Sequence, residues 1–135
     1  MGSDGPGFEL LGGVLRRVTE VIGPGAAYSM MHYAAVQEGQ RLASGGQDFA
    51  SALGHIDLAL GVQTRLVEDR SGKIVLRVEP RAPHAFVDRA VQGLMLGLYE
   101  GAIMAGLRRP VRAPTPSELH INGGSFLLEF GSATG

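Results

Sequence analysis

The chain has 135 residues, a length that corresponds to one domain, and 44% of them are hydrophobic and 19% charged, as in a typical globular protein. Its formal net charge of −1 provides no electrostatic basis for binding nucleic acid or an anionic membrane. The absence of cysteine excludes disulfides, thiolate metal sites and a cysteine nucleophile. Because a chain without disulfides gives no indication of an oxidising compartment, the cytoplasm is the default expectation.

Helical periodicity dominates the first part of the chain. Apolar residues recur at helical spacing with polar residues on the opposite side. "GPG" at 23–25 and "SGG" at 44–46 separate these segments, and Gly61 is the expected C-terminal stop of the last one. The predicted helices are 8–22, 26–43 and 47–60.

The period then shortens from about 3.6 to about 2 residues, which predicts strands. Segments 62–69 and 73–79 form a predicted hairpin whose turn contains Gly72. A long helix follows over 83–105, with Gly106 as its cap. A second predicted hairpin joins 117–121 to 125–130 through Asn122-Gly123-Gly124.

The element order is therefore ααα-ββ-α-ββ. It predicts an α+β fold in which a four-stranded antiparallel sheet of two hairpins has helices packed on one face. Residues 8–131 form the predicted domain, residues 1–7 a flexible lead and residues 132–135 a tail.

Three glycines follow one edge of the long helix. Gly93, Gly97 and Gly101 are four residues apart, and Ala105 continues the spacing. Another helix could approach this edge closely. Alternatively, the missing side chains could leave space for a ligand, and helix packing at one level of the edge is compatible with a cavity at the next. The facing small residues would then be Ala27, Ala34, Ala35 and Gly39.

Two further hypotheses concern the same helix. Residues 90–107 are apolar apart from Gln92 and Glu100, and a GxxxG pattern can mark a membrane interface. Because Glu100 would make insertion costly, a buried core helix is the preferred interpretation. The second half of helix 83–105 is apolar nearly all round, which suggests that it forms a homodimer interface.

Catalytic and metal-binding patterns are absent. The sequence has no GxSxG, P-loop or dinucleotide-binding motif. The histidines have no paired ligand spacing, so neither a metal nor a cofactor is expected. They are His32, His55, His84 and His120.

Three segments resemble the 4-vinyl reductase domain, whose fold is shared with haem nitric-oxide-binding domains and with subunits of the transport-protein-particle (TRAPP) complex. They are "YAAVQEGQRLA" (33–43), "GLMLGLYEGAIMAG" (93–106) and "SELHINGGSFLLEF" (117–130). His120 and Leu128 occupy the positions of the cysteines with which zinc-binding members hold their metal. The resemblance therefore carries over no metal site.

The resemblance implies a pocket between the helices and the sheet. We expect a domain that binds a small apolar or acyl-type ligand without catalytic activity, as a sensor, carrier or accessory factor. The alternatives are a protein–protein interaction or assembly subunit of the TRAPP type and a haem-based gas sensor that uses His32 or His84. The expected ligand-binding residues are Met31, Ala35, Leu76, Leu94, Gly97, Leu98, Gly101, Phe126 and Leu128.

Overall fold

The computed structural model describes residues 4–45, 48–121 and 124–133. Its helices and strands follow the predicted order, with two short 3-10 helices, η1 and η2, in the connections. The helical elements are α1 (Asp4–Ile22), α2 (Pro24–Leu42), α3 (Phe49–Leu60), η1 (Pro83–Val87), α4 (Arg89–Gly106) and η2 (Pro116–Glu118). The strands are β1 (Val62–Arg70), β2 (Lys73–Pro80), β3 (Val111–Arg112) and β4 (Phe126–Ser132). The predicted α+β class is confirmed.

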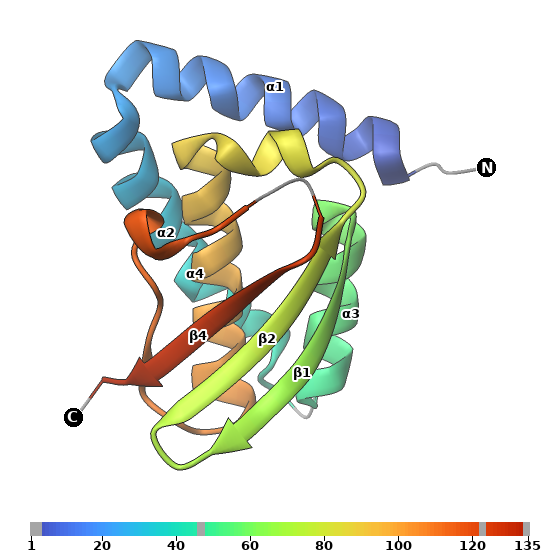
Figure 1. Cartoon of the computed structure of the whole chain (residues 1–135), viewed down its shortest axis with the longest axis vertical. Coiled ribbons are helices and arrows are strands. Elements are labelled where there is room, and N and C mark those ends of the chain that lie inside the picture. The colour runs from blue at the N-terminus through green and yellow to red at the C-terminus, as the bar shows by residue number, and fades with distance from the viewer. Residues whose placement is uncertain (1–3, 46–47, 122–123, 134–135) are drawn as a thin grey trace.

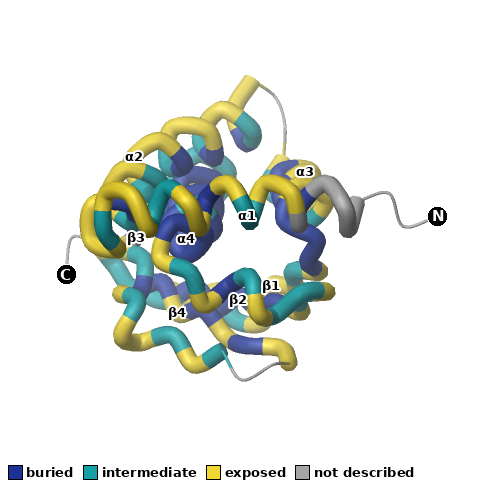
Figure 2. Tube along the Cα trace, turned by 90° about the horizontal axis from the view of Figure 1, so that it is seen from above, coloured by how far each residue is buried: buried dark blue, intermediate teal, exposed yellow. Residues whose placement is uncertain are grey.

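The strands form a single antiparallel sheet in the order β1-β2-β4-β3, and the helices cover one of its faces (Figure 1). Helix α4 lies against the sheet, and α2 packs on the side of α4 that faces away from the strands. Helix α3 lies beside α4 and β1, and α1 crosses one end of the layers. Buried residues are concentrated in α4 and on the inner side of the sheet (Figure 2).

The inner face of the sheet is apolar because successive strand residues point to opposite faces. Its β2–β4 pairs are all buried: Ile74 with Phe130, Leu76 with Leu128, and Val78 with Phe126. The predicted first hairpin is confirmed, with Gly72 at a φ of 86° in its turn. A bulge at Val67 interrupts β1, since Leu66 pairs with Leu76 but Glu68 pairs with Val75.

Local caps set the limits of α3. The side chain of Asp48 accepts a hydrogen bond from the Ser51 amide at 2.7 Å, which starts the helix. Gly61 ends it in the left-handed conformation at a φ of 65°, as the sequence predicts. Residue 47, the predicted start, lies outside the described residues, and α1 begins at Asp4 within the predicted lead.

The prediction of one continuous helix over 83–105 is wrong. Asp88 is extended, with a φ of −78° and a ψ of 137°, and it separates η1 from α4. Its carboxylate accepts hydrogen bonds from the amides of Ala90 and Val91 at 3.0 and 3.3 Å. This N-cap satisfies amide groups that the first turn of a helix leaves unpaired, so α4 starts at Arg89.

The predicted strand 117–121 is also wrong, because β3 lies at Val111–Arg112 and pairs with Gly131 and Ser132. Residues 116–118 form η2 instead. The Thr115 amide donates to the Glu118 carboxylate at 2.7 Å in a capping box, and Pro116 occupies the first turn. The predicted turn at Asn122-Gly123 lies outside the described residues.

The α2–α4 contact brings the two backbones together along the glycine edge. A methyl group at Gly97 would lie 2.6 Å from the carbonyl oxygen of His32. A methyl group at Gly101 would overlap with the carbonyl oxygen of Val36. From the other side, a methyl group at Gly39 would overlap with the carbonyl oxygen of Leu98. The expected close approach of a second helix is therefore confirmed, and α2 fills the space beside these glycines.

Helix α4 is the predicted buried core helix. Ala90, Leu96 and Ala102, which project from different sides of it, are all fully buried within the chain. Among the described residues, no helix combines the length and the apolar character that crossing a membrane requires.

The glycine contact predicts opposite effects for two substitutions. Gly101→Ala should lower the free energy of unfolding by about 1–3 kcal/mol, because the new methyl group meets the α2 backbone. Gly54→Ala, at a glycine of α3 with open space beside it, should raise this free energy by up to about 1 kcal/mol through helix propensity. Urea denaturation measures both, and a Gly101→Ala variant as stable as the parent would contradict the contact.

Candidate interaction surface

Helix α2 has two faces of different character. Its inner face carries the buried Ala27, Ala35 and Gly39 that contact α4. Its outer face points away from the sheet and is exposed (Figure 2). From Pro24 to Gln37, this helix contains no Asp, Glu, Lys or Arg. We call the exposed, uncharged residues Ala26, Ser29, Met30, Tyr33, Ala34 and Gln37 the α2 outer face.

Two large side chains dominate the α2 outer face. Met30 is 61% exposed and Tyr33 is 71% exposed. Met and Tyr are enriched in protein–protein interfaces, whereas charged residues are depleted from interface cores. Exposed helix surfaces are normally charged, so four turns without a charge mark this face as a candidate for association.

Helix α1 exposes a second set of apolar residues. Phe8 and Leu15 point into the core and are buried. Leu10, Val14 and Val21 lie together on another side of the helix, where the exposed Arg17 lies between Val14 and Val21, and Leu10 and Val21 are 74% and 81% exposed. The apolar arc of α1 is therefore wider than the part that the fold covers. We call Leu10, Val14 and Val21 the α1 stripe.

A homodimer interface in the second half of helix 83–105, as the sequence suggested, does not fit the structure. Leu96 and Ile103, the apolar residues that motivated it, are fully buried within the same chain. Helices α2 and α3 and the sheet already cover α4 on its different sides. Most of the exposed large apolar side chains of the described helices lie on α1 and α2 instead.

The structure divides the expected ligand-binding residues between two places. Leu76, Phe126 and Leu128 are buried on the inner face of the sheet. The helical members lie on α2 and α4, where Gly97 and Gly101 contact the α2 backbone. Ligand binding by this set would require these elements to separate, and it stays a prediction. The helical members are Met31, Ala35, Leu94, Gly97, Leu98 and Gly101.

A polar cluster joins α2 to α4 at the edge of their contact. His32 Nε2 lies 2.9 Å from a carboxylate oxygen of Glu100, and both side chains are largely buried. Tyr28 stacks on the His32 ring, with ring centroids 5.6 Å apart. Burial and the nearby Glu100 raise the pKa of Tyr28. The haem hypothesis requires the His32 imidazole as an iron ligand, but its Nε2 atom already contacts the Glu100 carboxylate.

The other haem candidate, His84, lies on η1 at the opposite end of α4 from the helix C-terminus. Among the described residues, no group of three or more His, Asp or Glu side chains is placed to hold a metal ion.

A second polar network connects α3, β1 and α4. Thr64 Oγ1 donates to Asp57 at 2.5 Å, so the buried Tyr99 hydroxyl must be the donor to Thr64, at 2.6 Å. Burial raises the pKa of Tyr99 and also that of Asp57. The network satisfies the hydroxyl group of Tyr99 inside the core, and it fixes α3 and β1 against α4.

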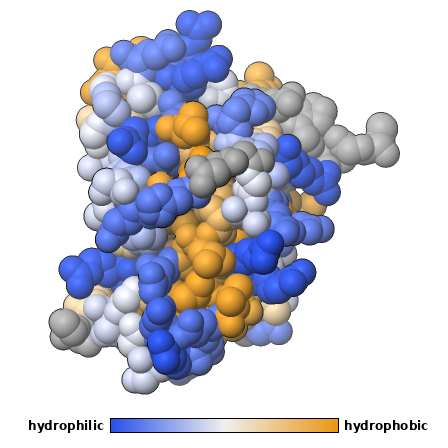
Figure 3. All heavy atoms as spheres, in the orientation of Figure 1, coloured by the Kyte–Doolittle hydropathy of each residue, from blue (hydrophilic) through white to orange (hydrophobic). Residues whose placement is uncertain are grey.

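The outer face of the sheet carries another apolar patch (Figure 3). Val67 and Leu127 are exposed there beside Val75, and the segment with Pro114 and His120 borders the same hollow of about 520 Å³. Charged residues line the rest of this hollow, and Lys73 lies 2.8 Å from Glu129 within it. The patch is thus bordered by paired charges, in contrast to the α2 outer face.

Neither a scan against models of protein families nor a search of curated proteins finds a match to this chain.

The α2 outer face was missed from the sequence although its signal is present. Met30 and Met31 are adjacent, but only Met31 faces the core. A helical projection of 24–42 places Met30 and Tyr33 opposite Ala35 and Gly39. Their exposure follows once the glycine edge of α4 identifies the inner face of α2.

The Tyr99 network predicts a specific pattern of stability. Thr64→Val should lower the free energy of unfolding by about 1–3 kcal/mol, because it leaves the buried Tyr99 hydroxyl without an acceptor. Adding Tyr99→Phe should restore part of this loss, since both partners are then apolar. Urea denaturation of the single and double variants measures the coupling. A double variant less stable than Thr64→Val alone would contradict the network.

Proposed function

We propose that this chain is a non-catalytic association module that forms a homodimer through the α2 outer face and the α1 stripe. The observation that carries this proposal is the absence of charge on the exposed face of α2 from Pro24 to Gln37. It corresponds to the assembly function that the sequence offered as an alternative to ligand binding. The apolar-ligand function would instead use residues that now lie within the core and the α2–α4 contact.

A second copy of the chain suits this face for an electrostatic reason. In a twofold dimer, residues near the axis meet the same residues of the partner. Like charges would then oppose each other, whereas the neutral Met30, Tyr33 and Ala34 would not. The small side chains Ala26 and Ala34 would also let two copies of α2 approach closely.

The energetics require more than one contact. Association costs an estimated 4–15 kcal/mol or more in lost freedom of motion. Each large apolar side chain that becomes fully buried contributes about 1.5–3 kcal/mol, and symmetry counts each contribution twice. Met30 and Tyr33 would therefore supply the centre of the interface, and the α1 stripe would supply the additional burial.

The proposal predicts that one buried charge separates the dimer. The parent protein should have the mass of two chains by size-exclusion chromatography with light scattering. Met30→Glu should shift this mass to one chain, because two glutamates would be desolvated near the axis. Leu58→Glu is the matched control, since Leu58 of α3 is 67% exposed and lies outside the proposed interface.

Two results would overturn the proposal. One is a parent protein that has the mass of a single chain across a concentration series. The other is a Met30→Glu variant that keeps the parent's mass and its circular dichroism spectrum.

A further inference from the structure

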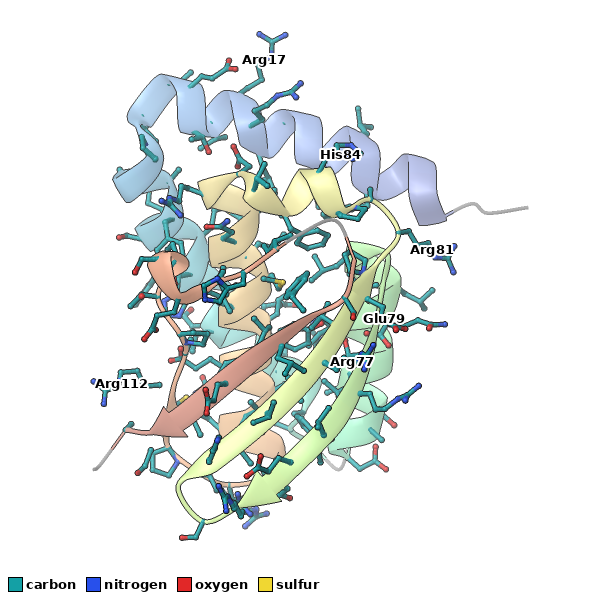
Figure 4. The ribbon with its side chains drawn as sticks, in the orientation of Figure 1. Arg17, Arg77, Glu79, Arg81, His84 and Arg112 are labelled. Carbon is teal, nitrogen blue, oxygen red and sulfur yellow. The ribbon has the colours of Figure 1, made fainter. Side chains whose placement is uncertain are left out.

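A hollow of about 480 Å³ lies where α1 crosses η1. Three of its lining residues, Ala82, Ala85 and Val87, are apolar, and Val87 is exposed. Arg16 of α1 and His84 of η1 also line it, and Figure 4 shows His84 between the two elements. The volume falls in the range of roughly 300–1,000 Å³ that is typical of small-molecule sites.

Two tertiary contacts hold α1 in place across this hollow. On one side, the rings of Phe8 and Phe86 stack with centroids 5.5 Å apart. On the other, the Thr19 hydroxyl donates to Asp88 at 3.0 Å. The hollow lies between these contacts, so its walls are fixed by packing and hydrogen bonding.

Gly12 and Gly13 leave the α1 wall of the hollow without side chains. A methyl group at Gly12 would just reach the Cβ of Ala85 at 4.0 Å, and one at Gly13 would meet nothing within 4 Å. The glycines of α4 are explained by contact with α2, but none of the described elements fills the space beside Gly13. Two glycines within a helix cost about 2 kcal/mol of helix propensity, and here they open a space.

The free hydrogen-bond donors around the hollow suit the oxygen atoms of an anion. Asp88, its one acidic lining residue, already accepts hydrogen bonds from Thr19 and from the amides of Ala90 and Val91. Within the described residues, no hydrogen bond or ion pair engages Arg16 or His84. The hollow therefore combines an apolar floor with a guanidinium and an imidazole that are free to donate.

We propose that this hollow binds a small organic carboxylate with an apolar body. The carboxylate accepts hydrogen bonds from the Arg16 guanidinium and from His84, and the apolar body lies on Ala82, Ala85 and Val87 against the bare helix wall. The residues that line the hollow belong neither to the α2 outer face nor to the α1 stripe, so this proposal does not rest on the proposed dimer.

Isothermal titration calorimetry with benzoate tests the site. Benzoate should bind saturably at one site per chain, whereas benzamide, which lacks the charge, and acetate, which lacks the apolar body, should bind at least about tenfold more weakly. Arg16→Gln should weaken benzoate binding at least about tenfold. Arg17→Gln is the matched control, because Arg17 is next in sequence but points outward from α1 (Figure 4), and it should leave the affinity unchanged.

A second pair of variants tests the space itself. Gly13→Leu should fill the hollow and abolish benzoate binding without unfolding the chain, because nothing obstructs its Cβ atom. Gly54→Leu, in open space on α3, should leave binding unchanged. The proposal is overturned if benzoate does not bind, if benzamide binds equally well, or if Arg16→Gln and Arg17→Gln weaken binding by the same factor.

Discussion

The close contact between the backbones of α2 and α4 determines the arrangement of the other elements. Side-chain-free positions at Gly93, Gly97 and Gly101 let α2 lie directly on α4, with Gly39 contributing from the opposite side. This contact buries one side of α4 while the sheet and α3 cover its other sides. The glycines lower helix propensity, but the tertiary contact that they permit is the most extensive between any two elements of the fold. Helix α4 thereby becomes the centre of the core.

This arrangement has a direct consequence for function. Because the inner face of α2 is committed to α4, its remaining residues point away from the molecule. From Pro24 to Gln37 these residues include Met30 and Tyr33 but no charged side chain, a composition that costs solubility and has no role in the core. Helix α1, which precedes α2 directly, likewise exposes Leu10, Val14 and Val21 beside the residues that it buries. Self-association would bury the exposed apolar residues of both α1 and α2 and would thereby explain their presence.

The sequence predicted most of the fold because its period and turn residues are local properties. Gly61 and Gly72 identify the end of α3 and the first hairpin, and the alternation in β2 and β4 identifies the apolar face of the sheet. Two elements were predicted wrongly because local side-chain caps compete with the pattern of apolar residues. Asp88 caps α4 inside an apparently continuous helix, and the Thr115–Glu118 capping box forms a turn where alternation suggested a strand. The interaction surface was not predicted, because the exposed side of α2 can be identified only after its inner contact is known.

A distance measurement between labels in two copies of the chain tests the central claim most directly. The chain contains no cysteine, so one introduced cysteine carries one spin label. Glu38→Cys places the label at the border of the α2 outer face, and Ser71→Cys places it in the β1–β2 turn. Double electron–electron resonance should give a defined intermolecular distance for the Glu38 position that is shorter than the distance for the Ser71 position. No intermolecular coupling at the Glu38 position, or a shorter distance at the Ser71 position, would contradict association through α2.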